Sequence, residues 1–562
     1  MKWQCALSRE RMQCKRCFWL EYVVVLCIIV LAPNQVLHAQ TSFKGQSEKE
    51  ANEKPSVEQP MVASSARSSR TVELTLEAAI RLALQQNLNV QREQLSPQVA
   101  LALVEQERSE FDPIVGLSIG LSQTKLLPVD QVTIANEDTG EVAESVIIEQ
   151  FSKDGELIPR LEQKILTGGN YELSFVNTRS NIAPAGFGAT RRIEDPRYES
   201  SLVLTFIQPL LRDFGIAVNT SFIRQGQKNV EIAQQQVLQT VLDLIFAVQQ
   251  SYWELVFRFR DLEARREALK LAEDFLADNQ KRVELKVLAP VELVQAETQV
   301  KFREGDVITA EAAVETADDQ LKEILNIPET ERTWQLQIRP TSEPPFVVLD
   351  QVDVEKQVDL AFANRPDLLQ SQLDIDAREI GQDFARNQLL PRVDIVGQGS
   401  MQAFGGGFEE SSRSLKDFKG YQWFIGMEFQ YPLSNRFARN RLQQQNLELK
   451  QARLNQRILK LVIGRQVRQA VRDISTSSQR VEVTRAATKL AQIQLQTEQA
   501  KFRVGLSTSF QVLDFQDELT QARIDEIRTL IDYNVDLASL DQLTGTLRYG
   551  DIASSTMKQR PY

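Results

Sequence analysis

Cysteine and histidine are almost absent from this sequence, and the few copies lie close to its beginning. The four cysteines occupy positions 5, 14, 17 and 27, and the single histidine is His38. A chain that starts after residue 39 therefore has neither type. Their absence excludes thiol nucleophiles, disulfides, Cys/His metal sites and the imidazole of a Ser-His-Asp triad. Any catalysis would have to use carboxylate or lysine chemistry.

Residues 1–39 have the pattern of a secretory signal peptide. Basic residues between positions 2 and 16 precede an apolar run, Tyr22–Ala32, and Leu37–Ala39 is typical of a cleavage site. The apolar run is too short to span a bilayer as a mature helix. A lipoprotein signal is the alternative, but Cys27 follows Leu26, where the lipoprotein peptidase requires a small residue. We therefore predict export and cleavage after residue 39, without lipidation.

The sequence also lacks an excess of positive charge, Gly-rich phosphate loops and long apolar runs. It has 65 basic and 76 acidic residues, a net charge of −11, which disfavours nucleic acid as a partner. Neither of the usual glycine spacings of a nucleotide-binding loop is present. Beyond the signal segment no apolar run reaches the length of a transmembrane helix, so entry into a membrane would require strands.

Carboxylate pairs are the main remaining candidates for catalysis. Asp318-Asp319 and Glu409-Glu410 are such pairs, and a glycosidase places two carboxyl groups beside its substrate. Adjacent acidic residues are, however, usually part of a solvated helix or loop surface. We therefore predict that the protein is not an enzyme and has no cofactor.

The sequence does contain two very long helical patterns. Residues 227–289 include neither glycine nor proline, and apolar residues recur there at alternating spacings of four and three: Val241, Ile245, Val248, Tyr252, Leu255, Phe259, Leu262, Leu269 and Leu276. This spacing predicts a coiled-coil-like helix, about 95 Å long at 1.5 Å per residue. A second pattern is interrupted only by Gly464. We predict the two long helices at about 217–289 and 434–504.

Strand-like segments precede each long helix. In the clearest one, five apolar residues alternate with mostly small or polar ones: Tyr421, Trp423, Ile425, Met427 and Phe429. Residues 115–121 and 171–175 alternate in the same way. This pattern is typical of a barrel strand between lipid and water, and also of a β-sandwich strand with one buried face. The combination with two long helices favours the barrel, so we predict that these five residues face lipid.

The two halves of the chain repeat one another. Glu77–Val115 aligns without a gap on Glu355–Val393, and Arg282–Glu297 aligns on Lys501–Gln516. The predicted organisation is a signal peptide at 1–39, a disordered leader at 40–70, a first repeat at 71–345, a second repeat at 346–548 and a tail at 549–562. Strands are expected at about 111–124, 198–211, 391–403 and 419–433. An added hairpin is expected at about 158–178, and the sequence leaves open whether it joins the barrel.

Four segments resemble the TolC-like family of outer-membrane efflux proteins. They are Leu74–Asn87 (LTLEAAIRLALQQN), Gln208–Leu211 (QPLL), Tyr431–Leu433 (YPL) and Lys501–Asp514 (KFRVGLSTSFQVLD). The resemblance covers the chain from Val72 to about Thr546. It implies a mostly α fold with a membrane β-barrel: a homotrimer whose subunits each give four strands to one barrel and four helical segments to a periplasmic tunnel.

The resemblance also implies a function and partners. The protein would be the outer-membrane channel of a tripartite efflux or type I secretion system. It would be a passive exit duct in outer-membrane lipid, and a periplasmic adaptor would connect it to an inner-membrane transporter. The alternative is a structural coiled coil such as an adhesin stalk, which accounts for the long helices but not for the paired amphipathic strands.

Particular residues at the two helix reversals receive roles from this resemblance. It places adaptor contact at Val504, Gly505, Leu506, Ser507, Thr508, Val287 and Leu288, and acidic residues of the aperture at Asp514 and Glu292. Two features depart from the family pattern. Lys286 stands where glycine is usual, which questions the geometry of the adaptor groove. Phe502 and Ser507 replace the tyrosine and arginine of the best-studied closed-state lock, so that lock cannot form here in the same way.

Overall fold

The computed structural model describes residues 71–126, 150–182, 197–287, 289–327, 336–347 and 352–547. All of them belong to one unit, Ser68–Tyr562. The predicted signal peptide, the predicted leader and the predicted tail lie outside the described residues, and so does Leu288.

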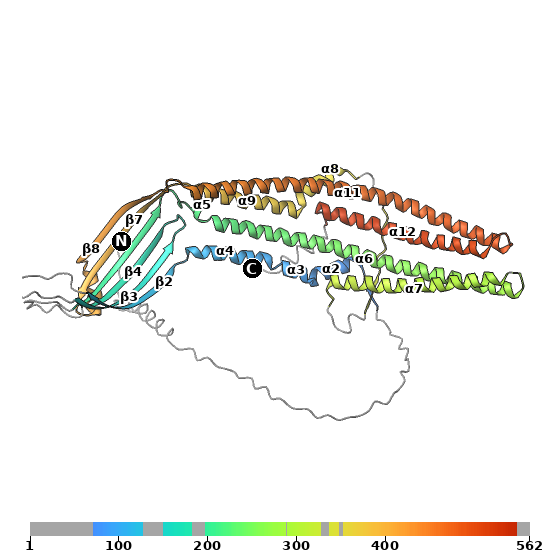
Figure 1. The fold of residues 1–562 in the computed structure, drawn as a ribbon, viewed down its shortest axis with the longest axis horizontal. Coiled ribbons are helices and arrows are strands. Elements are labelled where there is room, and N and C mark those ends of the chain that lie inside the picture. Colours follow the sequence, from blue (N-terminus) through green and yellow to red (C-terminus); the bar gives the residue numbers. More distant parts are fainter. Residues whose placement is uncertain are drawn as a thin grey trace, which may run out of the picture. The chain divides into compact units, whose positions relative to one another are not determined.

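Six strands form one antiparallel sheet. In spatial order they are β2 (Ile114–Leu126), β3 (Gln150–Lys164), β4 (Asn170–Ile182), β5 (Arg197–Pro209), β7 (Arg392–Gly405) and β8 (Gly420–Gln430). Figure 1 shows these strands side by side, with β2 and β8 at the two edges. The first repeat therefore supplies four strands of the sheet and the second repeat supplies two.

The strand count corrects the expectation of four strands for each subunit. The added hairpin, expected at about 158–178, is longer and lies within the sheet, because β3 pairs with β2 and β4 pairs with β5. Its turn contains Gly168 with a φ of 95°, and a Cβ atom there would lie 2.1 Å from the backbone oxygen of Asp213. Only glycine fits such a position without movement of the backbone.

Two helical hairpins carry most of the remaining chain. The first consists of α6 (Ser221–Glu284) and α7 (Pro290–Leu325), and the second of α11 (Arg436–Arg503) and α12 (Ser509–Thr544). Helices of 64 and 68 residues, α6 and α11, are each about 100 Å long. In each hairpin the two helices run side by side (Figure 1). Within the described part of the chain, no helix is both long and apolar enough to span a membrane.

Shorter helices precede the strands in both repeats. They are α2 (Leu76–Gln86), α3 (Leu88–Glu93) and α4 (Ser96–Arg108) in the first repeat and α8 (Val354–Asn364) and α9 (Pro366–Asn387) in the second. The first break in each series falls at equivalent positions, Asn87 and Arg365. The Asn87 side chain accepts hydrogen bonds from the N–H groups of Asn89 and Val90 and so caps α3.

Buried tyrosines attach the extended segments to the helices. The Tyr252 hydroxyl donates to the carbonyl of Leu74 at 2.9 Å and accepts from the N–H of Ser342 at 3.0 Å. Leu74 ends β1 (Thr71–Leu74), which pairs in parallel with β6 (Gln337–Pro340). In the second repeat the Tyr533 hydroxyl donates to the carbonyl of Val347. Each hydroxyl thus satisfies backbone groups that would otherwise be buried without partners.

A buried ion pair joins α7 to β6. The Lys322 ammonium lies 2.7 Å from the Asp318 carboxylate, and both side chains are almost fully buried. The N–H of Ile338 donates to the same carboxylate at 3.0 Å. Burial raises the pKa of Asp318, while these hydrogen bonds oppose the increase.

Replacing Asp318 with asparagine is expected to destabilise the helical region by about 3 kcal/mol, because it leaves the buried Lys322 without its closest counter-charge. The measurement is the thermal midpoint followed by far-UV circular dichroism. Asp319→Asn is the matched control, because Asp319 is 58% exposed and 3.7 Å from Lys322, so its loss should cost under about 1 kcal/mol. Equal midpoints for the two variants would contradict the assignment.

Candidate functional site

The reversal between α11 and α12 is an exposed turn of defined geometry. Gly505 has a φ of 76°. The N–H of Leu506 donates to the carbonyl of Lys501 at 2.9 Å, and the N–H of Gly505 donates to the carbonyl of Phe502. These bonds form a glycine-terminated helix C-cap. Val504 and Leu506 are 70% and 78% exposed. The turn therefore presents apolar side chains to solvent, and we name residues 504–508 the second tip.

A polar contact fixes the second tip against α11. The Ser507 hydroxyl donates to the Glu498 carboxylate at 2.6 Å, and the Lys501 ammonium donates to it at 2.9 Å. Both bonds favour the ionised carboxylate, so the pKa of Glu498 is lowered, most strongly by Ser507. Thr508 then caps α12, because its hydroxyl accepts from the N–H of Gln511. The turn is consequently ordered from both sides.

The reversal between α6 and α7 repeats this geometry with a different residue. Lys286 has a φ of 57°, and the N–H of Val287 donates to the carbonyl of Arg282 at 2.9 Å. These positions correspond to Gly505, Leu506 and Lys501 in the repeat alignment. Lysine thus adopts the left-handed conformation that glycine adopts in the second tip, at a cost of about 1 kcal/mol. The backbone turn is therefore preserved although Lys286 stands where glycine is usual. We name residues 285–287 and 289 the first tip.

The ends of the two hairpins contact each other through polar and aromatic side chains. The Asn279 amide donates to the Ser509 hydroxyl at 3.1 Å, and the N–H of Ser509 donates to the Glu292 carboxylate at 3.2 Å. The rings of Phe275 and Phe502 lie 5.3 Å apart. Glu292, predicted as an aperture acid, is therefore engaged at the start of α12.

Asp514, the other predicted aperture acid, lies in a different setting. It is exposed on α12 and lines a groove that also includes Arg265, Arg303, Asp306 and Asp517. The structure thus brings Asp514 close to basic side chains of the first hairpin. It does not place Glu292 in that groove.

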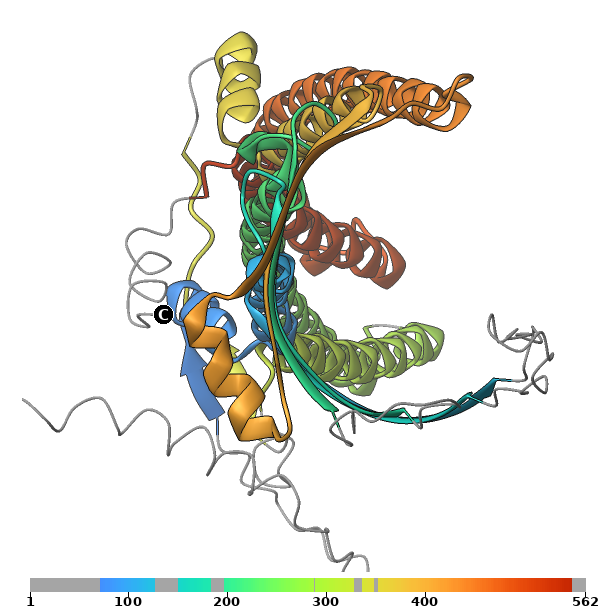
Figure 2. The same ribbon diagram turned by 90° about the vertical axis from the view of Figure 1, so that its left-hand side faces the viewer.

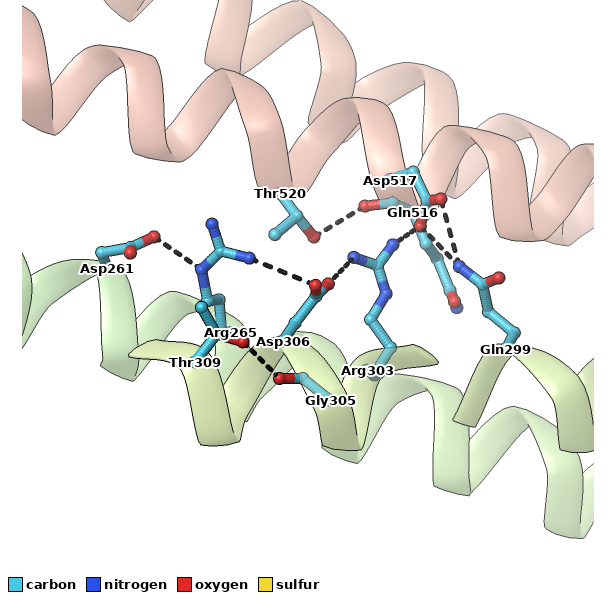
Figure 3. Close-up of polar contacts among 10 residues, drawn as sticks. All are labelled: Asp261, Arg265, Gln299, Arg303, Gly305, Asp306, Thr309, Gln516, Asp517 and Thr520. Atoms are coloured by element: carbon cyan, nitrogen blue, oxygen red, sulfur yellow. Dashed lines mark hydrogen bonds and ion pairs between the residues drawn. The ribbon is translucent and has the colours of Figure 1, made fainter. Parts of the chain in front are cut away.

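An ionic network joins the two helical hairpins at a distance from the tips. This network was not predicted from the sequence. Figure 3 shows Arg303 of α7 between Asp306 of its own helix and Asp517 of α12. Gln299 also donates to Asp517, at 3.0 Å, and Arg265 of α6 lies 3.6 Å from Asp306. The network therefore connects three helices from both repeats.

Arg303 is the more buried of the two arginines of this network. Its side chain is 12% exposed, and burial lowers its pKa, an effect that the carboxylate of Asp306 opposes. A buried guanidinium needs a counter-charge, and here it has two. A single arginine in a helix gives no periodic signal that distinguishes a buried, paired side chain from an ordinary solvent-exposed one. The buried position of Arg303 was therefore not predicted from the sequence. No group of three or more His, Cys, Asp or Glu residues among the described positions has the arrangement of a metal site.

The five apolar residues of β8 lie on one face of an edge strand. Tyr421, Trp423, Ile425, Met427 and Phe429 are each about 70% exposed in the single chain. The residues opposite them on β7 are Met401, Gly399, Gly397, Ile395 and Val393, which are apolar or lack a side chain. An exposed apolar face of this extent requires a covering partner or lipid.

Comparison with known proteins agrees with this architecture. Residues 358–546 match the family model of outer membrane efflux proteins. None of the curated protein sequences compared with the chain matches it.

Solved outer-membrane channels share the fold at low sequence identity. The CmeC channel of Campylobacter jejuni is 14% identical with a TM-score of 0.60, covering 86% of this chain and 88% of its own. VceC of Vibrio cholerae is 15% identical with a TM-score of 0.58, covering 84% and 96%. The open-state MtrE channel of Neisseria gonorrhoeae is 14% identical with a TM-score of 0.52, covering 87% and 97%.

These findings define a TolC-like channel fold, mostly α with a sheet of long strands, and confirm the predicted fold class. The second repeat carries the family match, and the predicted resemblance is confirmed there: residues 358–546 are similar to outer membrane efflux proteins. The family match also supports the predicted location in the outer membrane.

Proposed function

We propose that the protein is the passive outer-membrane duct of a tripartite efflux or type I secretion system. The observation that carries this proposal is the connection of a curved sheet to two helical hairpins. The edges of the sheet, β2 and β8, are unpaired in the single chain, and the longer helix of each hairpin is about 100 Å long. Three copies would close the sheets into one barrel, because closure removes exposed edges. The hairpins of three copies would surround the tunnel.

Gel migration with and without boiling separates this proposal from a structural coiled coil. A closed β-barrel trimer resists detergent, so we expect the purified protein to migrate as a compact trimer until it is boiled. Pull-down after chemical crosslinking should then recover a periplasmic adaptor and its inner-membrane transporter. Migration that does not depend on heating would contradict the barrel.

The two tips are the proposed surface for the adaptor. Both present exposed apolar residues, Val287 and Leu506 among them, on the same backbone turn. Repetition of the turn gives a trimer six similar tips, which suits an adaptor that binds repeatedly around a ring.

Replacing Gly505 with valine is expected to weaken adaptor binding at least tenfold while the trimer survives. A β-branched residue disfavours a φ of 76° by about 1–2 kcal/mol, so the second tip must change shape. Gly305→Val is the matched control, because Gly305 lies in α7 and a Cβ atom added there would also meet open space. The measurement is adaptor affinity by surface plasmon resonance, and equal affinities for both variants would refute the assignment of the second tip.

We propose a different division of roles for the two aperture acids. Asp514 is exposed in the groove between the hairpins and would help to form a negative ring, whereas Glu292 holds the start of α12. Asp514→Asn should therefore reduce cation preference and divalent block in single-channel recordings more than Glu292→Gln does. Unchanged selectivity in the double variant would remove both residues from the aperture.

The Arg303 network is the proposed closure device. It holds α7 and α12 together. The closed-state lock of the family cannot form here in the same way, because Phe502 and Ser507 replace its tyrosine and arginine. Its ion pairs would keep the two hairpins close, and their rupture would allow the hairpins to separate.

A further inference from the structure

The hairpin formed by β3 and β4 belongs to the sheet along its length. Ile114 to Leu121 of β2 lie opposite Glu162 to Gly155 of β3, without a break in the register. On the other side, Asn170 to Ser180 of β4 lie opposite Ile207 to Arg197 of β5. The hairpin therefore separates β2 from β5 and is not a loop that folds over the sheet.

One row of residues crosses all six strands at the same level. Its members, in the order of the strands, are Val115, Leu161, Leu173, Leu204, Gly399 and Trp423, each directly opposite the next. Directly opposite residues of an antiparallel sheet project from the same face. Along this row the apolar face that includes Trp423 thus continues across the hairpin.

The other face of the hairpin is charged. Glu162 follows Leu161 in β3, and Glu172 precedes Leu173 in β4. Because neighbouring residues of a strand point to opposite faces, both glutamates project from the face opposite the apolar row. They lie directly opposite each other, and Arg160 lies on the same face. Two like charges in a cross-strand pair are destabilising unless water surrounds them. At this level of the sheet the hairpin therefore has an apolar side suited to lipid and a charged side suited to water.

The curvature of the sheet shows which face is outward. The Ser200 hydroxyl of β5 is hydrogen-bonded to Ser411 of α10 (Phe408–Ser414) at 2.9 Å. Ser200 projects from the same face as Leu204, four residues further along the strand. Figure 2 shows the sheet as a curved surface with α10 on its convex side. The apolar row is therefore on the convex side and the charged row on the concave side.

We propose that β3 and β4 are membrane-spanning strands, so that three copies of this six-stranded sheet form an eighteen-stranded barrel in place of the twelve-stranded one that four strands per subunit imply. This inference rests on the proposed trimeric channel. Strand directions permit the closure, because β2 of one protomer is antiparallel to β8 of the next when each contributes six alternating strands.

A barrel with eighteen strands is wider than one with twelve. Barrel diameter grows roughly in proportion to strand number, so the diameter increases about 1.5-fold. Glu162 and Glu172 of each hairpin then line the concave, water-filled side. The leucines of the hairpin contact the acyl chains of outer-membrane lipid, as those of β5 do.

Single cysteine variants test this placement. All four native cysteines lie at positions 5–27, so an introduced cysteine is the only one in residues 40–562. We would label Leu173→Cys and Glu172→Cys in the hairpin with a small fluorophore, and Leu204→Cys and Thr205→Cys in β5 as matched controls. The full-length trimer in vesicles is then exposed to nitroxide-labelled lipid or to aqueous iodide. If Leu173→Cys does not assemble, Leu161→Cys, its neighbour in the same row, replaces it.

We expect lipid nitroxide to quench position 173 as strongly as position 204, and iodide to quench positions 172 and 205 several-fold more than either. Quenching of position 173 by iodide, with position 204 still quenched by lipid, would place the hairpin outside the membrane and overturn this inference alone. Quenching of position 204 by iodide would also overturn the proposed channel, because β5 itself would then lie outside the membrane.

Discussion

Replacing Met427 with arginine is expected to abolish insertion of the trimer into the outer membrane. Met427 is 70% exposed on the apolar face of β8, between Ile425 and Phe429 on the same side. An arginine that faces lipid near the middle of the membrane costs about 2–4 kcal/mol, and a trimer carries three copies. The measurement is the amount of heat-sensitive trimer in the outer-membrane fraction.

Gln422→Arg is the matched control for this substitution. Gln422 lies on the same strand, opposite Ser400 of β7, and projects from the other face. Arginine at this position would meet water on the concave side, so near-normal insertion is expected. Normal insertion of the Met427 variant together with failure of the Gln422 variant would show that the sheet has its opposite face toward lipid.

Reversing the charge of Arg303 is expected to open the tunnel. Arg303→Glu places a third carboxylate beside Asp306 and Asp517 in a position that is 12% exposed. Asp306 and Asp517 are 41% and 48% exposed, so loss of these charge-assisted contacts costs about 1–3 kcal/mol, which is enough to change which state of a two-state closure predominates. We expect the mean single-channel conductance in a planar bilayer to rise several-fold above that of the parent.

Two further variants make this prediction specific. Arg303→Glu combined with Asp517→Arg restores opposite charges between α7 and α12 and should lower the conductance again. Arg266→Glu breaks an exposed ion pair with Glu311 inside the first hairpin, worth under about 1 kcal/mol, and should leave conductance unchanged. Parental conductance in Arg303→Glu would show that the network does not hold the tunnel closed.

The regular elements were predictable because their periodicities are long and uninterrupted. The second long helix was expected at about 434–504, in a segment interrupted only by Gly464, and α11 spans Arg436–Arg503. The first was expected from about 217, but α6 begins at Ser221 because α5 (Ile216–Asn219) forms a separate turn that ends at Thr220. The alignment of Arg282–Glu297 on Lys501–Gln516 also brought Lys286 and Gly505 to equivalent positions, which have the same backbone conformation.

Other features depend on contacts between distant segments and were not predictable in the same way. The hairpin was expected to begin near residue 158, but β3 starts at Gln150, because Lys153, Asp154 and Glu156 disrupt the apolar signal of the strand. The position of the hairpin between β2 and β5 follows from pairing rather than from local sequence. The Arg303 network joins residues more than 200 positions apart, so a helical pattern alone cannot reveal it.

Single-channel recording of the purified full-length trimer in a planar bilayer tests the proposed duct most directly. We expect stepwise, ohmic currents in symmetric salt without any added nucleotide or other energy source, and larger steps when Arg303 is replaced by glutamate. A trimer that shifts on boiling but carries no current, with or without that replacement, would contradict the proposal that this protein is an open-ended outer-membrane channel.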